Sequence, residues 1–312
     1  MRVVFLGSPP FATPVLQSLL DSRHEVIALV TRPDRPLGRG LAVRASPLVE
    51  LARSRDLRVL QPETTKDPAF VAELRKLSPD VLLVASYGEI LRREMLELAP
   101  QGALNVHASL LPRHRGASPI QAAILAGDAE TGVAVQKMVL ALDEGDVLYK
   151  AWTPIGAREN AGALLERLSV LGGEAAVTSL DLLERGDARF RPQDPSAATY
   201  ARRMKKEEGR IDWSKSPVEI DRHVRAMTPW PGARTVAPNG REIVVLELRA
   251  APRGEHAPAD PGTVLATDPE LEIACGGGAV AILSVKPSGG VAMDAAAWLR
   301  GARIEPGARF TS

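Results

Sequence analysis

Cysteine, net charge and long apolar runs are all scarce in this sequence of 312 residues. Its one cysteine, Cys275, excludes an internal disulfide and a cysteine-based zinc cluster, and is typical of a reducing cytosol. The net charge of +1 argues against a bulk polyanion binder, so a nucleic-acid site would need a local basic patch. No apolar run is long enough for a membrane span, and the N-terminus lacks the apolar region of a signal peptide. We therefore expect a cytoplasmic protein.

Short apolar segments alternate with helical patterns over the first half of the chain. Because 312 residues exceed what one core usually needs, we expect two domains. The alternation predicts an α/β domain with a doubly wound, mostly parallel, Rossmann-like sheet. The predicted strands are residues 2–6, 25–31, 81–85, 103–106 and 133–138, and the clearest helical patterns are residues 69–77, 120–126 and 163–183.

The second half of the chain has shorter, β-type runs. Residues 185–196 are polar and rich in turn-forming residues, which is typical of a linker. After one predicted helix at 218–226, runs separated by Pro, Gly and Asp suggest a small C-terminal β-barrel of the oligonucleotide-binding (OB) kind. We therefore predict a first domain at residues 1–188, a linker at 189–206 and a second domain at 207–312.

An amide and an imidazole follow a short apolar run in the first domain. Asn105 and His107 are two residues apart, so in an extended backbone they point to the same face, with Val106 turned into the core. Such a pair at the carboxyl end of a strand can polarise a carbonyl and move a proton. Because ligands of doubly wound sheets lie beyond these strand ends, we expect residues 7–8 and 86–88 on the same rim.

Asp143 is the candidate partner of this pair. It lies in the turn Asp-Glu-Gly-Asp, a composition that is common in turns without a function. The functional alternative is that Asp143 fixes the tautomer of His107 and raises its basicity, or that Asp143 is itself the base. An acid–base pair of this kind typically contributes about 10²–10⁴-fold in rate.

Two basic segments are candidates for phosphate contact. The loop at residues 31–40 contains two prolines, two glycines and three arginines, which suits contact with phosphates but equally suits a solvated crossover loop. The other segment is the basic run at residues 202–206. Such runs are usually solvated helix faces, and this one becomes a second contact only if it lies on the same side as the loop.

Metal and nicotinamide chemistry are not indicated. The histidines other than His107 are scattered without ligand spacing, so we expect no metal site. Pro9 and Pro10 stand where a dinucleotide fingerprint would present main-chain amides to phosphate, which argues against a nicotinamide dehydrogenase.

Taken together, these segments resemble the methionyl-tRNA formyltransferases, a family of the folate-dependent formyltransferase superfamily. Asn-x-His with Ser-Leu-Leu-Pro and the later Asp-x-Gly-Asp are specific to the superfamily, whereas Pro-Asp-Arg-Pro-x-Gly-Arg-Gly and Ile-Asp-Trp narrow the resemblance to the tRNA enzymes. The matching segments are residues 7–9, 11–12, 33–40, 85–88, 105–121, 127–133, 142–147, 199–201, 210–213 and 229–231.

The resemblance implies that Asn105, His107 and Asp143 form a catalytic trio. The implied reaction moves the formyl group of 10-formyltetrahydrofolate, a co-substrate, to the amino group of methionyl-initiator tRNA, with no metal. The residues implied to line the folate site are Ser109, Leu110, Leu111, Pro112, Tyr87, Gly88, Ile90 and Leu91. Those implied to contact tRNA, together with the C-terminal barrel, are Arg32, Arg35, Arg39 and Arg44 of an insertion loop at about 32–45, and Arg202, Lys205 and Lys206.

Two other functions are compatible with part of these motifs. A related formyltransferase acting on a sugar-nucleotide or ribonucleotide amine would share the trio but would have no use for the 32–45 loop or the barrel. A catalytically silent RNA-binding protein would not need all three chemical residues. No heptad seam calls for assembly, so we expect a monomer.

Overall fold

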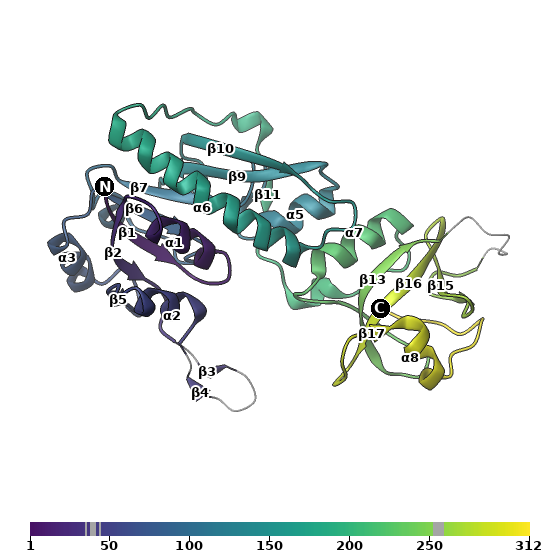
Figure 1. The fold of residues 1–312 in the computed structure, drawn as a ribbon. Helices are drawn as coiled ribbons and strands as arrows, with labels where there is room; N and C mark the ends of the chain where they lie inside the picture. The colour runs from purple at the N-terminus through teal and green to yellow at the C-terminus, as the bar shows by residue number, and fades with distance from the viewer. Residues whose placement is uncertain (35, 38–41, 44, 252–258) are drawn as a thin grey trace. The chain divides into compact units, whose positions relative to one another are not determined.

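The computed structural model describes residues 1–34, 36–37, 42–43, 45–251 and 259–312 (Figure 1). The chain forms two compact units, each described here by itself. The first unit contains residues 1–119, 130–154 and 165–202, and the second contains residues 120–129, 155–164 and 203–312. The predicted linker at 189–206 is therefore shared between the units, and the predicted domain limits stay a prediction.

A seven-stranded sheet forms the centre of the first unit, in the order β10-β9-β7-β6-β1-β2-β5. The five strands from β7 to β5 are parallel, while β9 is antiparallel to both β7 and β10. This arrangement confirms the predicted doubly wound, mostly parallel sheet. The strands are β1 (Arg2–Gly7), β2 (Glu25–Val30), β5 (Val59–Leu60), β6 (Val81–Ala85), β7 (Ala103–His107), β9 (Glu130–Lys137) and β10 (Val147–Pro154).

Two helices of the first unit begin at residues whose side chains cap them. The side chains of Ser46 and Asp67 accept hydrogen bonds from the main chain of the first turns of α2 and α3, and a proline follows each cap. The helices are α1 (Ala12–Leu20), α2 (Pro47–Ser54), α3 (Pro68–Lys76), α4 (Arg93–Leu96) and α6 (Ala161–Arg185), of which residues 161–164 belong to the second unit. Helix α5 (Pro119–Ala126) has only Pro119 in the first unit.

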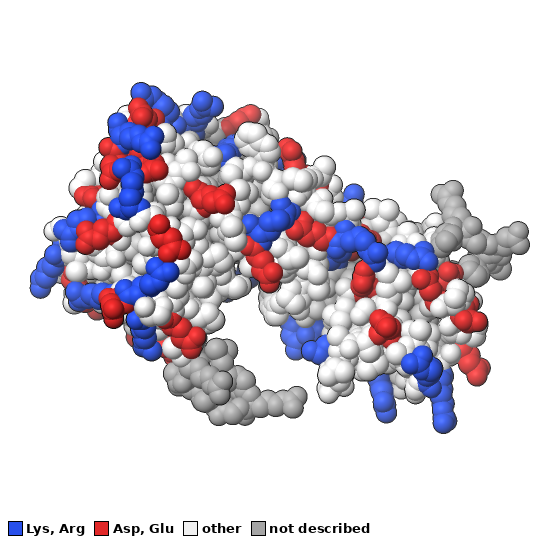
Figure 2. Space-filling model, viewed as in Figure 1, with Lys and Arg blue, Asp and Glu red and all other residues white. Residues whose placement is uncertain are grey.

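Charges of both signs are interspersed on the viewed surface of each unit (Figure 2). Among the described residues, no helix is both long and apolar enough to cross a membrane.

Two short strand pairs complete the first unit: β3 (Pro36–Leu37) with β4 (Ala42–Val43), and β8 (Arg115–Gly116) with β11 (Tyr200–Ala201).

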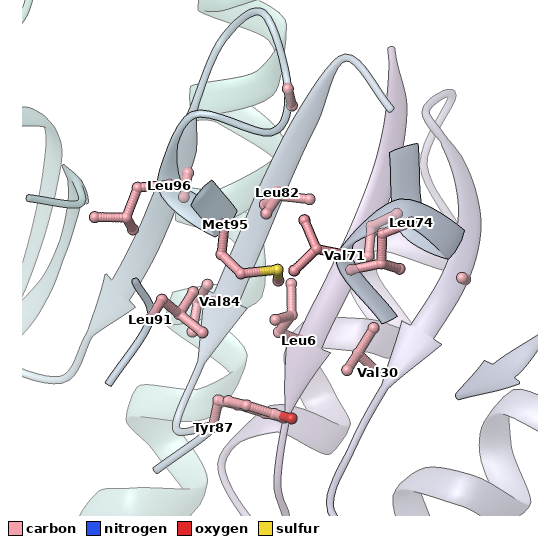
Figure 3. Close-up of a cluster of buried hydrophobic side chains, with 14 of the residues drawn as sticks. Leu6, Val30, Val71, Leu74, Leu82, Val84, Tyr87, Leu91, Met95 and Leu96 are labelled. Carbon is pink, nitrogen blue, oxygen red and sulfur yellow. The ribbon is translucent and has the colours of Figure 1, made fainter. Parts of the chain in front are cut away.

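Helices α3 and α4 pack on one face of the sheet. Leu74 and Met95 are fully buried against Leu6, Leu82 and neighbouring strand residues (Figure 3). On the other face, a Cβ on Gly172 of α6 would lie 3.1 Å from a methyl of Val106 in β7, so this helix lies directly on the strand. This confirms that Val106 turns into the core, and it leaves the opposite face of β7 for Asn105 and His107.

The second unit is built on a six-stranded antiparallel sheet, in agreement with the predicted small C-terminal β domain. Its helix α7 (Pro217–Met227) begins with a reciprocal cap between Ser216 and Glu219. Phe310 packs against Trp213 and Trp298, with ring centroids 6.1 and 6.4 Å away. The other elements are β12 (Ala233–Val236), β13 (Glu242–Ala250), β14 (Val264–Ala266), β15 (Leu271–Cys275), β16 (Gly278–Pro287), β17 (Met293–Asp294), α8 (Ala295–Ala302) and the 3₁₀ turns η1 (Pro195–Ala197, in the first unit) and η2 (Lys206–Gly209).

Candidate active site

The carboxyl ends of three neighbouring parallel strands form one rim. In the sheet register Gly7 lies beside Ala85, and Val84 lies beside Asn105, so β1, β6 and β7 end together. Across this rim the Ser8 hydroxyl donates a hydrogen bond of 3.3 Å to the main-chain oxygen of Tyr87. The predicted grouping of residues 7–8, 86–88 and 105–107 at one edge is confirmed.

Asn105 and His107 both reach Asp143, which lies on the loop between β9 and β10. The Asn105 amide nitrogen is 3.4 Å from Asp143 Oδ1, and His107 Nδ1 is 3.7 Å from Asp143 Oδ2. The His107 and Asp143 side chains are 6 % and 12 % exposed, so solvent screens the pair only weakly. The structure therefore brings together the three residues that the sequence analysis singled out.

Two further groups hold the Asp143 carboxylate, and the sequence analysis did not include them. Gln136 Nε2 donates to Oδ1 at 2.9 Å, and the main-chain amide of Gly116 donates to Oδ2 at 2.8 Å. Gln136 is 1 % exposed and lies directly across from Asn105 in the register of β9 and β7. An amide within the apolar run Val-Ala-Val-Gln of β9 was the available signal, since buried polar side chains need partners.

The other ring nitrogen of His107 is also engaged. His107 Nε2 lies 3.0 Å from the main-chain oxygen of His114. Because a carbonyl oxygen only accepts hydrogen bonds, Nε2 carries a proton in this arrangement. His114 has a φ of +57° and is held in turn by a 2.8 Å hydrogen bond from its main-chain amide to Thr199 Oγ1. Nδ1 is the ring nitrogen that faces the Asp143 carboxylate.

The run Ser109–Leu110–Leu111–Pro112 continues directly from β7, and much of it is buried. The Ser109 hydroxyl donates to the main-chain oxygen of Arg113 at 2.6 Å, and its side chain is fully buried. Leu111 is also fully buried, and its main-chain oxygen accepts a hydrogen bond from Lys150 Nζ. Burial lowers the pKa of Lys150. Leu110 and Pro112 are the partly exposed members of this run.

The segment Tyr87–Gly88–Glu89–Ile90–Leu91 is divided between core and surface. Tyr87 and Leu91 belong to the buried cluster beneath α3 and α4 (Figure 3). Burial, with a smaller contribution from the charge of Glu89, raises the pKa of Tyr87 to about 12. Ile90 is 75 % exposed. Gly88 is also exposed, and its main-chain oxygen accepts a hydrogen bond from the Arg32 guanidinium.

The residues implied to contact tRNA lie in several places. Arg32 is exposed and bonded to the Gly88 segment at the rim. Arg202 ends the first unit, and Lys205 and Lys206 are exposed near the start of the second unit. The remaining three, Arg35, Arg39 and Arg44, lie outside the described residues.

A hollow of about 570 Å³ lies in the first unit, along the edge strand β10. Among the residues implied to line the folate site, Pro112 also lines this hollow. The remaining lining comes from β10 and from residues 182–194, and it mixes the cations Lys150 and Arg191 with Asp187 and Asp194. The lining therefore has no single sign of charge.

One histidine that looked isolated in the sequence has acidic neighbours in the structure. Ligand atoms of His24, Asp181 and Glu184 lie within 4.8 Å of one another. Both carboxylates already pair with Arg23 at 2.6 Å, and Glu184 also pairs with the Met1 amino group at 2.8 Å. Cations of the protein thus already neutralise the acidic groups of this cluster.

Comparison with protein families identifies the class to which this fold and rim belong. A family model described as "Formyl transferase" matches residues 1–180, and one described as "Formyl transferase, C-terminal domain" matches residues 203–303. Both halves of the chain are thus those of a formyl transferase.

Relatives with higher sequence identity narrow this class. The chain is 42 % identical to methionyl-tRNA formyltransferase of Geotalea daltonii (99 % of this chain, 98 % of the relative) and 44 % identical to that of Thiobacillus denitrificans (99 % of both). The chain belongs to the methionyl-tRNA formyltransferase family.

Solved structures with lower sequence identity share the fold. One is an N-formyltransferase of Helicobacter canadensis in complex with folinic acid and dTDP-3-aminofucose (TM-score 0.66, 15 % identity, 90 % of this chain and 98 % of that chain). Another is HypX of Aquifex aeolicus in complex with tetrahydrofolic acid (TM-score 0.65, 20 % identity, 97 % of this chain), of which the match spans 47 %.

Proposed function

We propose that this protein transfers the formyl group of 10-formyltetrahydrofolate to the amino group of methionyl-initiator tRNA, giving N-formylmethionyl-tRNA for translation initiation. The observation that carries the proposal is the meeting of Asn105, His107 and Asp143 at the strand rim of a formyl transferase fold. The choice of methionyl-tRNA as the amine is supported by relatives of that name that align over 98–99 % of their own length.

The geometry suits attack of an amine on a formyl carbon. As the new C–N bond forms, negative charge collects on the formyl oxygen. The Asn105 amide and the Nδ1–H of a protonated His107, whose Nε2 donates to the His114 carbonyl, can donate hydrogen bonds to that oxygen. One such donor is worth about 2.7–4 kcal/mol in comparable acyl-transfer sites. The C–N bond to the folate then breaks, and a proton must pass from the attacking amine to the departing nitrogen. Asp143 is placed to assist that transfer directly or through His107.

The proposed folate site lies along the rim on both sides of this trio. Tyr87, Leu91, Ser109 and Leu111 are buried, so their contribution would come through main-chain groups and the packing beneath them. Gly88, Ile90, Leu110 and Pro112 would offer the accessible surface. Folate complexes of the two solved neighbours support a folate as the donor. The formyl carbon keeps its oxidation state, so the transfer itself requires no redox cofactor.

The proposed tRNA contacts are cationic. The exposed side chains of Arg32, Lys205 and Lys206 would bind phosphates, and Arg202 would join them. We also expect Arg35, Arg39 and Arg44, which lie outside the described residues, to bind phosphates of the tRNA. We expect the protein to act as a monomer.

Formylation of defined amines tests this function. Purified protein is incubated with 10-formyltetrahydrofolate and one amine in each of three separate reactions. The amines are methionyl-initiator tRNA, an amino-sugar nucleotide and a ribonucleotide amine. We expect formylation of the tRNA, and a fall of about 10²–10³-fold in kcat for Asn105→Ala, which removes one donor to the oxyanion. Formylation of either small amine with none of the tRNA would reject the proposal in favour of the related enzymes.

A matched control separates the site from the scaffold. Glu130→Gln removes an exposed carboxylate at the start of β9, the strand that also carries Gln136. This variant should formylate methionyl-tRNA at the rate of the unmodified protein.

A further inference from the structure

The loop that carries Asp143 has a main-chain conformation that needs support. Asp143 has a φ of +53°, a left-handed conformation that costs a residue with a Cβ roughly 1 kcal/mol or more. Two residues further on, the loop has no room for a side chain, because a Cβ on Gly145 would lie 1.6 Å from the main-chain oxygen of Lys137. The position of the Asp143 carboxylate therefore depends on which groups hold this loop.

The side chain of Gln193, 50 residues further along the chain, holds the loop on both sides of Glu144. Its Nε2 lies 2.8 Å from the main-chain oxygen of Asp143 and 2.7 Å from that of Gly145. It also lies 3.2 Å from Gln136 Oε1, and Gln136 is itself bonded to the Asp143 carboxylate. The Gln193 amide is thus connected directly to the main chain of Asp143, and through Gln136 to the Asp143 carboxylate.

The orientation of the Gln193 amide is fixed by a buried cation. Arg115 Nε and Nη2 donate to Gln193 Oε1 at 3.1 and 3.0 Å, and Arg115 is 4 % exposed. Because a guanidinium only donates hydrogen bonds, the amide oxygen must face Arg115, and the amide NH₂ must face the loop. Arg115 also pairs with Glu144 at 3.1 Å, which ties the same loop a second time.

We infer that Gln193 is a positioning residue for Asp143, a role that rests on the proposed formyl transfer. It lies in the polar segment that the sequence analysis treated as a linker, and the structure places this residue in the first unit. Gln193 does not touch the reacting atoms in this inference. Its two donated hydrogen bonds keep the Asp143 loop where the carboxylate meets His107 and the Gly116 amide.

The Gly116 amide provides a direct readout, because its proton points at Asp143 Oδ2. We would compare its hydrogen exchange in ¹⁵N-glycine-labelled unmodified protein, Gln193→Ala and Gln193→Glu. The Glu variant keeps the side-chain length and the acceptor for Arg115 but removes the donor to the two carbonyls. It therefore carries the test if the Ala variant fails to fold. The control is Ser196→Ala, whose hydroxyl bonds to Asp194 within its own turn.

In both Gln193 variants the Gly116 amide should exchange faster. The kcat should fall by about ten- to a hundredfold, the scale expected for a displaced catalytic group. The KM for tRNA and for folate should change little. Ser196→Ala should change neither. A lower kcat with an unchanged Gly116 amide, or no effect on either, would overturn the inference. If the unmodified protein does not formylate methionyl-tRNA, the proposed function fails, and the exchange of Gly116 still decides whether Gln193 positions Asp143.

Discussion

The two halves of the candidate active site are built in different ways. Asn105 and His107 belong to β7, which is paired with β6 on one side and β9 on the other. Asp143 belongs to a loop, has a positive φ, and is held by side chains from β9 and from residue 193. The strand half thus depends on main-chain pairing and apolar packing, and the loop half on polar contacts between residues distant in sequence.

This difference predicts different consequences of substitution. A change beneath the strand half should cost stability, because the sheet and its core form one packed unit. A change in the loop half should cost activity first, because hydrogen bonds to a surface loop contribute little to the overall free energy of unfolding. Five substitutions, each at one position of the described chain, test that contrast.

Asp143→Asn should give the largest loss of activity. The amide keeps the size of the side chain but cannot take up a proton, so kcat should fall by about 10²–10⁴-fold. Steady-state formylation and thermal unfolding of the same preparation would measure both effects. A folded variant with nearly unmodified kcat would remove Asp143 from the mechanism and leave the strand half as the whole site.

Gly145→Ala should disturb the loop through its main chain. The added Cβ would meet the main-chain oxygen of Lys137 at 1.6 Å, so the loop must shift. We expect kcat to fall by about tenfold or more, since a displacement of about 1 Å can cost that much.

Gly301→Ala is the control for this substitution. Gly301 lies in α8, and a Cβ there would meet no atom within 4 Å. It should leave kcat unchanged and raise stability slightly, because alanine favours a helix more than glycine does. Equal kcat values for the two variants would show that the Asp143 loop tolerates displacement.

Val106→Ala should show the opposite signature in the strand half. Val106 is 2 % exposed and lies against α6, so removing two methyl groups should lower the free energy of unfolding by about 2 kcal/mol. Denaturant unfolding measures this loss. We expect kcat to change little at temperatures where the variant is folded, and a large kcat loss without destabilisation would contradict the contrast.

Tyr87 offers the smallest effect, one confined to alkaline pH. Burial raises its pKa to about 12, above the value of about 10 for an unfolded chain. The folded state therefore holds a proton that the unfolded state releases, so this contribution is complete below pH 10 and is lost as the pH rises toward 12. Tyr87→Phe should reduce the loss of stability over that range. The difference in phenolate absorbance between the two proteins should have its midpoint near pH 12.

Local patterns predicted much of the fold. Continuous apolar runs identified β1 and β6 because strands buried on both faces need apolar side chains throughout. The spacing of Asn105 and His107 predicted that they share a face, since alternation is a property of any extended strand. The predicted elements did not include β10, whose residues alternate between buried and exposed, or the short strands β8 and β11.

Local periodicity and short motifs were enough to predict the family and the doubly wound sheet, and to single out Asn105, His107 and Asp143 as candidate chemical residues. Only the tertiary structure decided how Asp143 is held. Gln136, Gly116 and Gln193 reach it from separate segments, and such contacts arise from chain packing rather than from spacing along the chain. A polar residue in a turn-rich segment has no local pattern that distinguishes a solvated side chain from one bonded to an active-site loop.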